Sequence, residues 1–337
     1  MAGATIEFAF PFNADVVWKR LAAPFTDQSP QRKQSPITFL TVVPTIYNRL
    51  LGSFPSLDEK TQKAARMGIS PQNLRLNISG SAALPTPTKA AWSKLSNGNV
   101  LLERYGMTEV GMALSCGLDF ADRVDGSVGW PLPSVQVRLV DTESGEVIEP
   151  GQEHSADGKE REGEIQLRGP TICSEYFRNP EATAKEFVEG DDGNGRWFKT
   201  GDIGTRYNVD GAGKSDQEWA KGPLYFIKGR KSVDIIKTGG EKVSALEIER
   251  ELLSLPEIAE AAVVGLPSEQ WGQKVAAVIV LTSDGMTAGK GGKAWGAMDM
   301  RRALRDRLAN YKIPQDLKVV DSIPKNAMGK SKFTFLD

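Results

Sequence analysis

A change of hydrophobic period near residue 125 constrains the fold of this chain more than any other feature of its sequence. Up to about residue 120, strand patterns alternate with helix patterns; residues 37–43 predict a strand, and Pro44 is placed to open a helix. Farther along, segments such as Gly163–Arg168 alternate apolar and polar residues between Gly and Pro turns. The first pattern is typical of a parallel sheet with helical crossovers, and the second is typical of antiparallel strands.

Local signals predict several further elements. A helix is expected over residues 14–21 with Asn13 as its N-cap, and another over Thr86–Leu95 after a strand at residues 74–79. Residues 1–10 are expected to form a buried strand. The polar, glycine-rich segment 208–222 is expected to be an exposed hairpin insertion.

These patterns divide the chain into three parts. Residues 1–124 are predicted to form a partial parallel α/β subdomain, and residues 125–229 an antiparallel, barrel-like subdomain. Residues 230–337 combine a helix near 245–254 with strands that follow it, which indicates a small C-terminal α+β domain. The predicted fold class is therefore a multidomain combination of α/β and α+β parts.

Composition and rare residues exclude several kinds of function. The net charge of −1 provides no basic surface for nucleic acid, and no apolar run approaches the roughly 20 residues that span a bilayer. Cys116 and Cys173 are the only cysteines, too few for a disulfide framework or a zinc cluster. His154, the only histidine, lies in a polar run and is expected in a solvated loop. Ser-His-Asp and Cys-His mechanisms are thereby disfavoured.

The segment 104–109, Arg-Tyr-Gly-Met-Thr-Glu, carries the groups that a nucleotide site needs. The ring of Tyr105 can stack on a base, and Gly106 permits a close approach of the backbone to a ligand. Thr108 can donate to a phosphate, and the carboxylate of Glu109 can hold Mg²⁺. By itself, the segment is also compatible with an ordinary strand end and turn.

Three further blocks follow in order: Trp-Phe-Lys-Thr-Gly-Asp at 197–202, a glycine-containing segment at 229–243, and Pro-Lys-Asn-Ala-Met-Gly-Lys at 324–330. Together with segment 104–109 they resemble the signatures of the adenylate-forming (AMP-binding) enzymes, the superfamily of acyl-CoA synthetases, luciferases and peptide-synthetase adenylation domains. The resemblance extends over nearly the whole chain. It implies an enzyme that uses ATP, Mg²⁺, CoA and a small-molecule carboxylic acid.

The resemblance assigns roles to particular residues. Adenine would lie against Tyr105 and the small-residue loop after the strand at 74–79, the ribose would contact Asp202 and Arg230, and Glu109 would hold the magnesium ion. The implied nucleotide-binding residues are Gly80, Ser81, Ala82, Tyr105, Gly106, Thr108, Asp202 and Arg230.

The C-terminal blocks are assigned by the same resemblance. Lys330 matches the catalytic lysine that bridges the acyl carboxylate and the α-phosphate, and it acts with Thr108 and Glu109. Ser232 takes the hinge position of a mobile C-terminal domain. Lys237, Gly239 and Gly240 would line the CoA tunnel.

Arg104 narrows the expected acid. An arginine directly before the Tyr-Gly-Met-Thr-Glu run resembles the malonyl-CoA synthetase subgroup, and a guanidinium in the acyl pocket can pair with a distal carboxylate. A surface or structural ion pair is the alternative role of Arg104.

Two alternatives to malonate activation remain open. One is an acyl-CoA synthetase for another short- or medium-chain acid. The other is a catalytically incomplete nucleotide-binding fragment, because no Gly- and hydroxyl-rich phosphate loop ending in Pro-Lys-Gly occurs in the sequence. The chain is therefore expected to be the N-terminally truncated, larger part of a longer enzyme. The sequence leaves the oligomeric state open, and also the compartment, with the cytoplasm and the mitochondrial matrix both possible.

Overall fold

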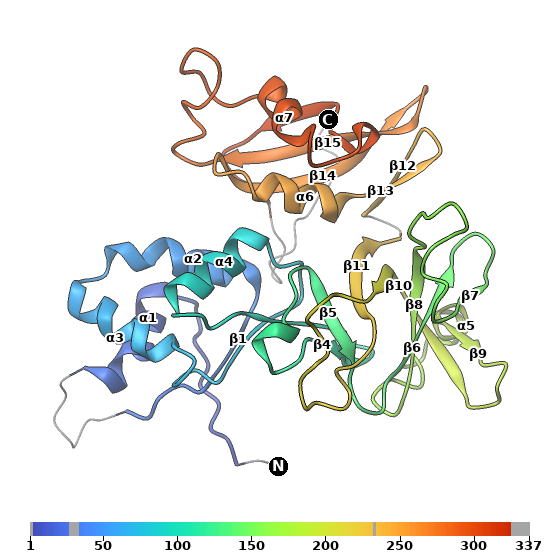
Figure 1. The fold of residues 1–337 in the computed structure, drawn as a ribbon, viewed down its shortest axis with the longest axis horizontal. Helices are drawn as coiled ribbons and strands as arrows, with labels where there is room; N and C mark the ends of the chain where they lie inside the picture. Colours follow the sequence, from blue (N-terminus) through green and yellow to red (C-terminus); the bar gives the residue numbers. More distant parts are fainter. Residues whose placement is uncertain (1–2, 27–33, 232–233, 325–337) are drawn as a thin grey trace. The chain divides into compact units, whose positions relative to one another are not determined.

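The computed structural model describes residues 3–26, 34–231 and 234–324 (Figure 1). The chain forms two compact units, the first made of residues 1–84 and 88–102 and the second of residues 85–87 and 103–337. The three-part division expected from the sequence stays a prediction. The fold class is confirmed, because the chain combines helices with a large multistranded sheet and a second, small sheet.

The first unit is built from helices around a short parallel strand pair. Its elements are α1 Ala14–Ala22, β1 Phe39–Val42, α2 Pro44–Ser53, α3 Glu59–Ile69, β2 Leu76–Ser79 and α4 Thr86–Leu95. β1 and β2 pair in parallel, with Phe39 opposite Leu76. The core contains Trp18, which stacks on Trp92 with ring centroids 6.1 Å apart.

Local chemistry explains why most of these elements were predictable. The side chain of Asn13 accepts a hydrogen bond from the backbone N–H of Val16 (3.1 Å), which caps α1, and Pro44 occupies the first turn of α2. The helix α3 was not predicted. The expected strand at residues 1–10 is wrong for the described residues 3–10, which form no strand and leave Phe8 and Phe10 89% and 94% exposed. An alternation of apolar and polar residues leads to a strand only where a neighbouring strand supplies hydrogen bonds to its backbone.

The second unit contains a long run of strands (Figure 1). Within this unit they lie in the order β3-β4-β5-β11-β10-β8-β6-β7, and β9 pairs with β10. Their bounds are β3 Leu102–Met107, β4 Gly111–Ser115, β5 Ser127–Pro131, β6 Gln136–Asp141, β7 Val147–Ile148, β8 Gly163–Arg168, β9 Phe187–Glu189, β10 Arg196–Tyr207 and β11 Leu224–Arg230, with the helix α5 Pro180–Glu186 before β9.

Antiparallel pairing begins earlier than the sequence suggested. β3 and β4 already pair antiparallel, although both lie within the range expected to be a parallel subdomain. The connection at residues 108–110 is a short turn, and a parallel pairing would need a crossover of a dozen or more residues.

The segment 208–222 connects β10 to β11 and is only partly exposed. Ala220 is fully buried, and the indole N–H of Trp130 donates to the backbone carbonyl of Gly222 (2.9 Å). Asp122 accepts hydrogen bonds from the backbone N–H of Gly213 (2.7 Å) and from the hydroxyl of Ser215 (2.6 Å). The expectation of an exposed insertion is therefore wrong for this part of the loop, because polar anchors and an apolar cluster hold it against its neighbours.

A small sheet follows in the order β13-β12-β15-β14, with β16 paired in parallel to β15. Its elements are β12 Ile235–Thr238, β13 Glu241–Ser244, α6 Ala245–Leu253, β14 Ile258–Ser268, β15 Gly272–Leu281, α7 Ala297–Leu304 and β16 Asp316–Val319. Ile248 and Leu252 of α6 pack with Met300 and Leu304 of α7 in one apolar core. Among the described residues, no helix has both the length and the apolar character of a membrane span.

Candidate active site

Strand β3 and the turn after it carry most of segment 104–109. Residues 102–107 are strand, and residues 108–110 form the turn, closed by a hydrogen bond from the backbone N–H of Val110 to the carbonyl of Met107 (3.1 Å). The register with β4 shifts between Tyr105 and Gly106. A Cβ atom at Gly106 would lie 2.0 Å from the carbonyl oxygen of Gly111. The close approach of β4 thus requires a glycine here, whatever a ligand requires.

Tyr105, Asp202 and Arg230 come together although they are far apart in the sequence. The hydroxyl of Tyr105 donates to Oδ2 of Asp202 (2.7 Å), and Nε of Arg230 donates to Oδ1 (3.0 Å). Asp202 is buried and Arg230 is half-exposed. Burial, and secondarily the charge of Asp202, raise the pKa of Tyr105, so its hydroxyl remains a donor at neutral pH.

The segment that presents Asp202 is a distortion inside β10 and not a turn between strands. The register of β10 against β8 shifts between Lys199 and Ile203, and Gly201 has a φ of 72°. The backbone N–H of Asp202 donates to the hydroxyl of Thr200 (3.1 Å), which in turn donates to the carbonyl of Ile165 (2.7 Å). Thr200 therefore fixes the backbone that carries the carboxylate.

The arrangement around Asp202 suits a vicinal diol. Among the described residues, each carboxylate oxygen of Asp202 accepts one hydrogen bond, which leaves a further lone pair that can accept a hydroxyl. A ribose offers two such hydroxyls. The expected ribose contacts, Asp202 and Arg230, are thus held together by the structure, and Tyr105 is joined to the same group.

Arg104 lies on β3 directly before this cluster and is half-buried. Its Nε donates to the hydroxyl of Ser115 (3.2 Å), its partner residue on β4. Among the described residues, no carboxylate pairs with it. Burial lowers the pKa of the Arg104 guanidinium, and no neighbouring charge offsets that effect. A partly desolvated cation with a neutral partner is suited to receive an anion.

Thr108 and Glu109 occupy the turn after β3, where Thr108 is exposed and Glu109 is half-buried. Oε1 of Glu109 accepts a hydrogen bond from the hydroxyl of Tyr176 (3.1 Å), and the Glu109 carbonyl accepts one from the backbone N–H of Cys173 (2.7 Å). Nothing in the sequence pointed to Tyr176.

The chemistry of Glu109 fits a magnesium ion that arrives with a nucleotide. Mg²⁺ is commonly held by one or two carboxylates together with phosphate oxygens and water. Over the described ranges, no group of three or more His, Cys, Asp or Glu residues could form a metal site of their own. A single carboxylate at the end of β3 is the kind of ligand that a phosphate-bound metal ion needs.

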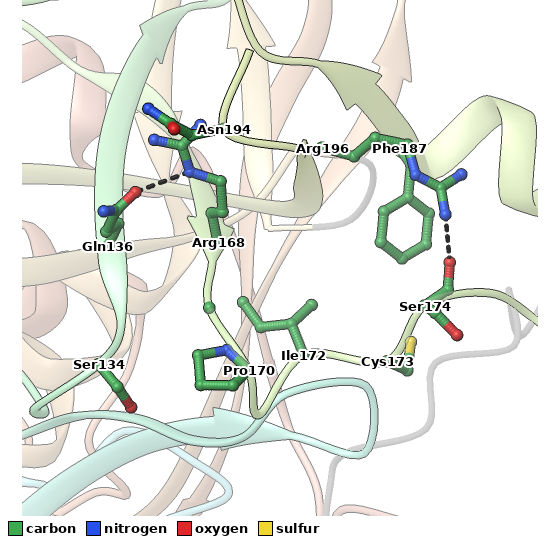
Figure 2. Close-up of a pocket in the computed structure, with 11 residues that line it drawn as sticks. Ser134, Gln136, Arg168, Pro170, Ile172, Cys173, Ser174, Phe187, Asn194 and Arg196 are labelled. Atoms are coloured by element: carbon green, nitrogen blue, oxygen red, sulfur yellow. Dashed lines mark hydrogen bonds between the residues drawn. The ribbon is translucent and has the colours of Figure 1, made fainter. Parts of the chain in front are cut away.

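A separate pocket of about 640 Å³ lies beside the segment that follows β8 (Figure 2). Figure 2 shows Arg168 and Arg196 in the upper part of the view and Pro170, Ile172 and Cys173 below them. Arg168 donates to Gln136 (2.7 Å), and Arg196 donates to the carbonyl of Ser174 (2.7 Å). The residues that line the pocket include none of the expected nucleotide ligands.

The expected adenine loop belongs to the first unit. Gly80, Ser81 and Ala82 follow β2 without helix or strand structure, and Ser81 and Ala82 are exposed. Ser81 has a φ of 69°, in the left-handed region that non-glycine residues seldom adopt. The loop is therefore a tight, exposed corner at the carboxyl end of a parallel strand, which is where α/β sheets bind ligands.

The expected CoA-tunnel residues form a hairpin in the small sheet. Lys237 is exposed on β12, and Gly239 and Gly240 form the turn to β13 with φ values of 57° and 87°. Such a two-residue turn needs a positive φ at both positions, which favours glycine. A Cβ at Gly239 would lie 2.9 Å from the Trp271 ring, a neighbour that the sequence did not suggest. The hinge residue Ser232 and the catalytic candidate Lys330 lie outside the described residues.

Comparison with known proteins identifies the family of this chain. The profile of the AMP-binding enzyme family matches residues 20–177, and that of the AMP-binding enzyme C-terminal domain matches residues 247–330. The chain is 58% identical to a CoA ligase of Gibberella moniliformis, over 98% of this chain and 56% of that protein. It is 40% identical to the mitochondrial malonate–CoA ligase of Homo sapiens, over 97% of this chain and 53% of that protein.

Solved structures give the same result. The ATP-bound MatB of Rhodopseudomonas palustris superimposes with a TM-score of 0.69 at 34% identity, over 95% of this chain and 52% of that one. The chain belongs to the AMP-binding enzymes, the adenylate-forming superfamily that includes the acyl-CoA synthetases. It spans about half the length of the relatives that it matches.

Proposed function

We propose that this chain is the part of a malonate–CoA ligase that binds AMP, the acid and CoA. The reaction would be malonate + ATP + CoA to malonyl-CoA + AMP + pyrophosphate. Family membership and the ligases among its relatives support acid–CoA ligase chemistry. The observation that carries the choice of malonate is Arg104, a half-buried guanidinium on β3 without a carboxylate partner among the described residues.

The first step joins malonate to AMP. An oxygen of one malonate carboxylate attacks the α-phosphorus of ATP, and pyrophosphate leaves. Arg104 holds the other carboxylate through charge-assisted hydrogen bonds, so that only the reacting carboxylate faces the phosphate. Asp202 and Arg230 hold the ribose, and Tyr105 stacks against adenine.

The remaining residues of this step would stabilise the negative charge of the phosphates. Lys330 would bridge the acyl carboxylate and the α-phosphate as negative charge develops there. Thr108 donates to phosphate, and Glu109 would hold Mg²⁺, which neutralises phosphate charge when it is bound.

The second step transfers the acyl group to CoA. The CoA sulfur attacks the acyl carbon, and AMP leaves with the electron pair of the broken C–O bond. The hairpin with Lys237, Gly239 and Gly240 would lie against the pantetheine arm, where two glycines permit a close approach of the backbone. Ser232 would be the hinge about which the C-terminal domain moves between the conformation for the first step and the conformation for the second.

Competition between acids tests the proposed substrate. Malonate and butyrate would be supplied together with ATP and CoA, and the two thioesters would be separated by chromatography. Malonyl-CoA should dominate, because butyrate places a methyl group against Arg104. A product that is mainly butyryl-CoA would exclude malonate as the substrate and leave a ligase of other specificity.

The two half-reactions test the roles of the C-terminal residues. In a longer enzyme that contains this chain and a phosphate loop, Lys330→Ala should slow adenylate formation by about 10²-fold or more, because one transition-state donor is lost. Thioester formation from supplied malonyl adenylate should change little. Gly240→Asn should show the reverse pattern, since asparagine tolerates the positive φ of this turn and its side chain narrows the path of CoA. Single-turnover measurement of each step decides the assignment, and equal losses in both steps for Lys330→Ala would contradict it.

A further inference from the structure

Glu109 is held from outside its own segment by residues 173–176. The backbone N–H of Cys173 donates to the Glu109 carbonyl (2.7 Å), and the hydroxyl of Tyr176 donates to Oε1 of its side chain (3.1 Å). One short segment therefore fixes both the main chain and the carboxylate of Glu109. Oε2 remains without a hydrogen-bond partner among the described residues and is free for a ligand.

Tyr176 is itself firmly placed. Its backbone N–H donates to the hydroxyl of Thr183 (3.0 Å) in α5, and that hydroxyl donates to the carbonyl of Asn179 (2.9 Å). Asn179 caps the same helix, accepting from the N–H of Ala182 (3.1 Å). The Tyr176 ring packs against the apolar core of the large sheet. A phenol anchored in this way has little freedom to follow a moving carboxylate.

We infer that Tyr176 is a positioning residue that sets the rotamer of the Glu109 carboxylate and leaves Oε2 for the metal ion of Mg·ATP. The hydrogen bond occupies one carboxylate oxygen and orients the other. The metal part of this inference rests on the proposed function, whereas the contact between the two residues does not.

The phenol is a durable donor for this purpose. Burial, together with the adjacent Glu109 carboxylate, raises the pKa of Tyr176 to about 12. It stays protonated at neutral pH and can donate only while Glu109 accepts. Outer groups that orient a metal ligand commonly change metal affinity by about 10- to 100-fold when they are removed.

The metal role is tested without turnover. Mn²⁺ binding in the presence of ATP would be followed by electron paramagnetic resonance in the wild type, Tyr176→Phe, Glu109→Gln and the double variant. Tyr176→Phe should weaken Mn²⁺ binding about 10-fold, and should have no further effect once Glu109 is Gln. Unchanged binding in Tyr176→Phe, or an equal loss in the Glu109→Gln background, would overturn the inference.

Two matched controls separate positioning from folding. Tyr207→Phe removes a hydroxyl from a ring that stacks on Phe226 (centroids 4.2 Å apart), and should leave Mn²⁺ binding unchanged. Cys173→Ala keeps the backbone N–H that holds the Glu109 carbonyl, and should also bind Mn²⁺ normally. A loss in Cys173→Ala equal to that in Tyr176→Phe would show a general effect of the segment and would contradict a role for the phenol.

A second measurement tests the contact in the protein without nucleotide. The six tyrosines would be replaced biosynthetically by 3-fluorotyrosine, and the ¹⁹F resonance missing from Tyr176→Phe identifies Tyr176. Its ¹⁹F chemical shift at neutral pH should change in Glu109→Gln, because the phenol then donates to a neutral amide and not to a carboxylate. An unchanged resonance refutes the contact. If the resonance moves but the wild type binds no Mn·ATP, the contact stands and the proposed function fails.

Discussion

Two neighbouring residues of β3, Arg104 and Tyr105, lead to regions that differ in charge balance. Tyr105 reaches Asp202, whose carboxylate also accepts from Arg230, so acid and cation are already paired. Among the described residues, Arg104 donates to the neutral hydroxyl of Ser115 and has no carboxylate partner. The proposed ribose side is thus preorganised and needs only hydroxyl groups. On the proposed acid side, a ligand of opposite charge would neutralise the Arg104 cation.

Among the substitutions that test this difference, a change at Arg104 is expected to have the largest effect on activity. Arg104→Leu should reduce kcat/KM for malonate by about 100-fold or more, roughly 3 kcal/mol, because the distal carboxylate would lose its partner in a half-buried site. Use of butyrate should be unchanged or improved. Steady-state kinetics with both acids measures this.

Arg75→Leu is a suitable control for that experiment, since Arg75 is exposed and precedes β2. If malonate kinetics are the same in Arg104→Leu and in this control, the unpaired cation does not recognise the acid. The difference in charge pairing around Arg104 and around Tyr105 would then have no consequence for substrate binding.

A smaller effect is expected on the ribose side. Asp202→Asn keeps the shape but removes the charge that faces Arg230, and should weaken AMP binding by about 30-fold, roughly 2 kcal/mol. Calorimetry with AMP and its 2′,3′-dideoxy analogue provides the measurement. The wild type should prefer AMP, whereas the variant should bind both alike.

The matched control is Asp192→Asn, which removes a carboxylate paired with Arg168 (2.7 Å) beside the separate pocket. It should leave AMP affinity intact. An Asp202→Asn protein that still prefers AMP to the dideoxy analogue would show that the diol is bound elsewhere.

Tyr105→Phe should have a still smaller effect. It keeps the ring for stacking and removes one hydrogen bond to Asp202, so AMP affinity should fall about fivefold, roughly 1 kcal/mol. Calorimetry is again sufficient, with Tyr207→Phe as the control. A loss as large as that in Asp202→Asn would mean that the phenol contacts the nucleotide directly.

Arg230→Gln should have the smallest effect of the series. The side chain is 50% exposed, and exposed ion pairs contribute about 1 kcal/mol or less. AMP affinity should fall by about threefold or less at moderate salt, with less loss at high salt, as titrations at two ionic strengths would show. A larger loss that is independent of salt would show that the contact of Arg230 with the ribose contributes more to AMP affinity than an exposed ion pair does.

Elements with local signals could be predicted from the sequence. The cap at Asn13, the proline at the start of α2 and the strict alternation in β8 each act over a few residues, and those elements appear where they were expected. The strand expected at residues 1–10 fails, because strand formation depends on a partner that the local pattern does not reveal. For the same reason, the antiparallel pairing of β3 with β4 was not foreseen.

The residues of the candidate site also divide into those that local motifs predicted and those that depend on distant partners. Tyr105, Asp202 and Arg230 were expected from motif blocks, and the structure joins them by hydrogen bonds. Tyr176 was missed, because it contacts Glu109 from 67 positions away and belongs to no block that suggested a role. Gly106 was interpreted as a residue that lets a ligand approach, although a Cβ atom at this position would first meet the carbonyl of Gly111. Tertiary partners of this kind are decided by packing and not by local sequence.

The separate partners of Arg104 and Tyr105 have an evolutionary consequence. Arg104 contacts Ser115 on β4, whereas Tyr105 contacts Asp202 on β10. If Arg104 binds the acid as proposed, a mutation at position 104 changes the preferred acid and leaves the contact of Tyr105 with Asp202 intact. Gene duplicates of such an enzyme can acquire new substrates one substitution at a time, and the adenylation chemistry persists through every intermediate form.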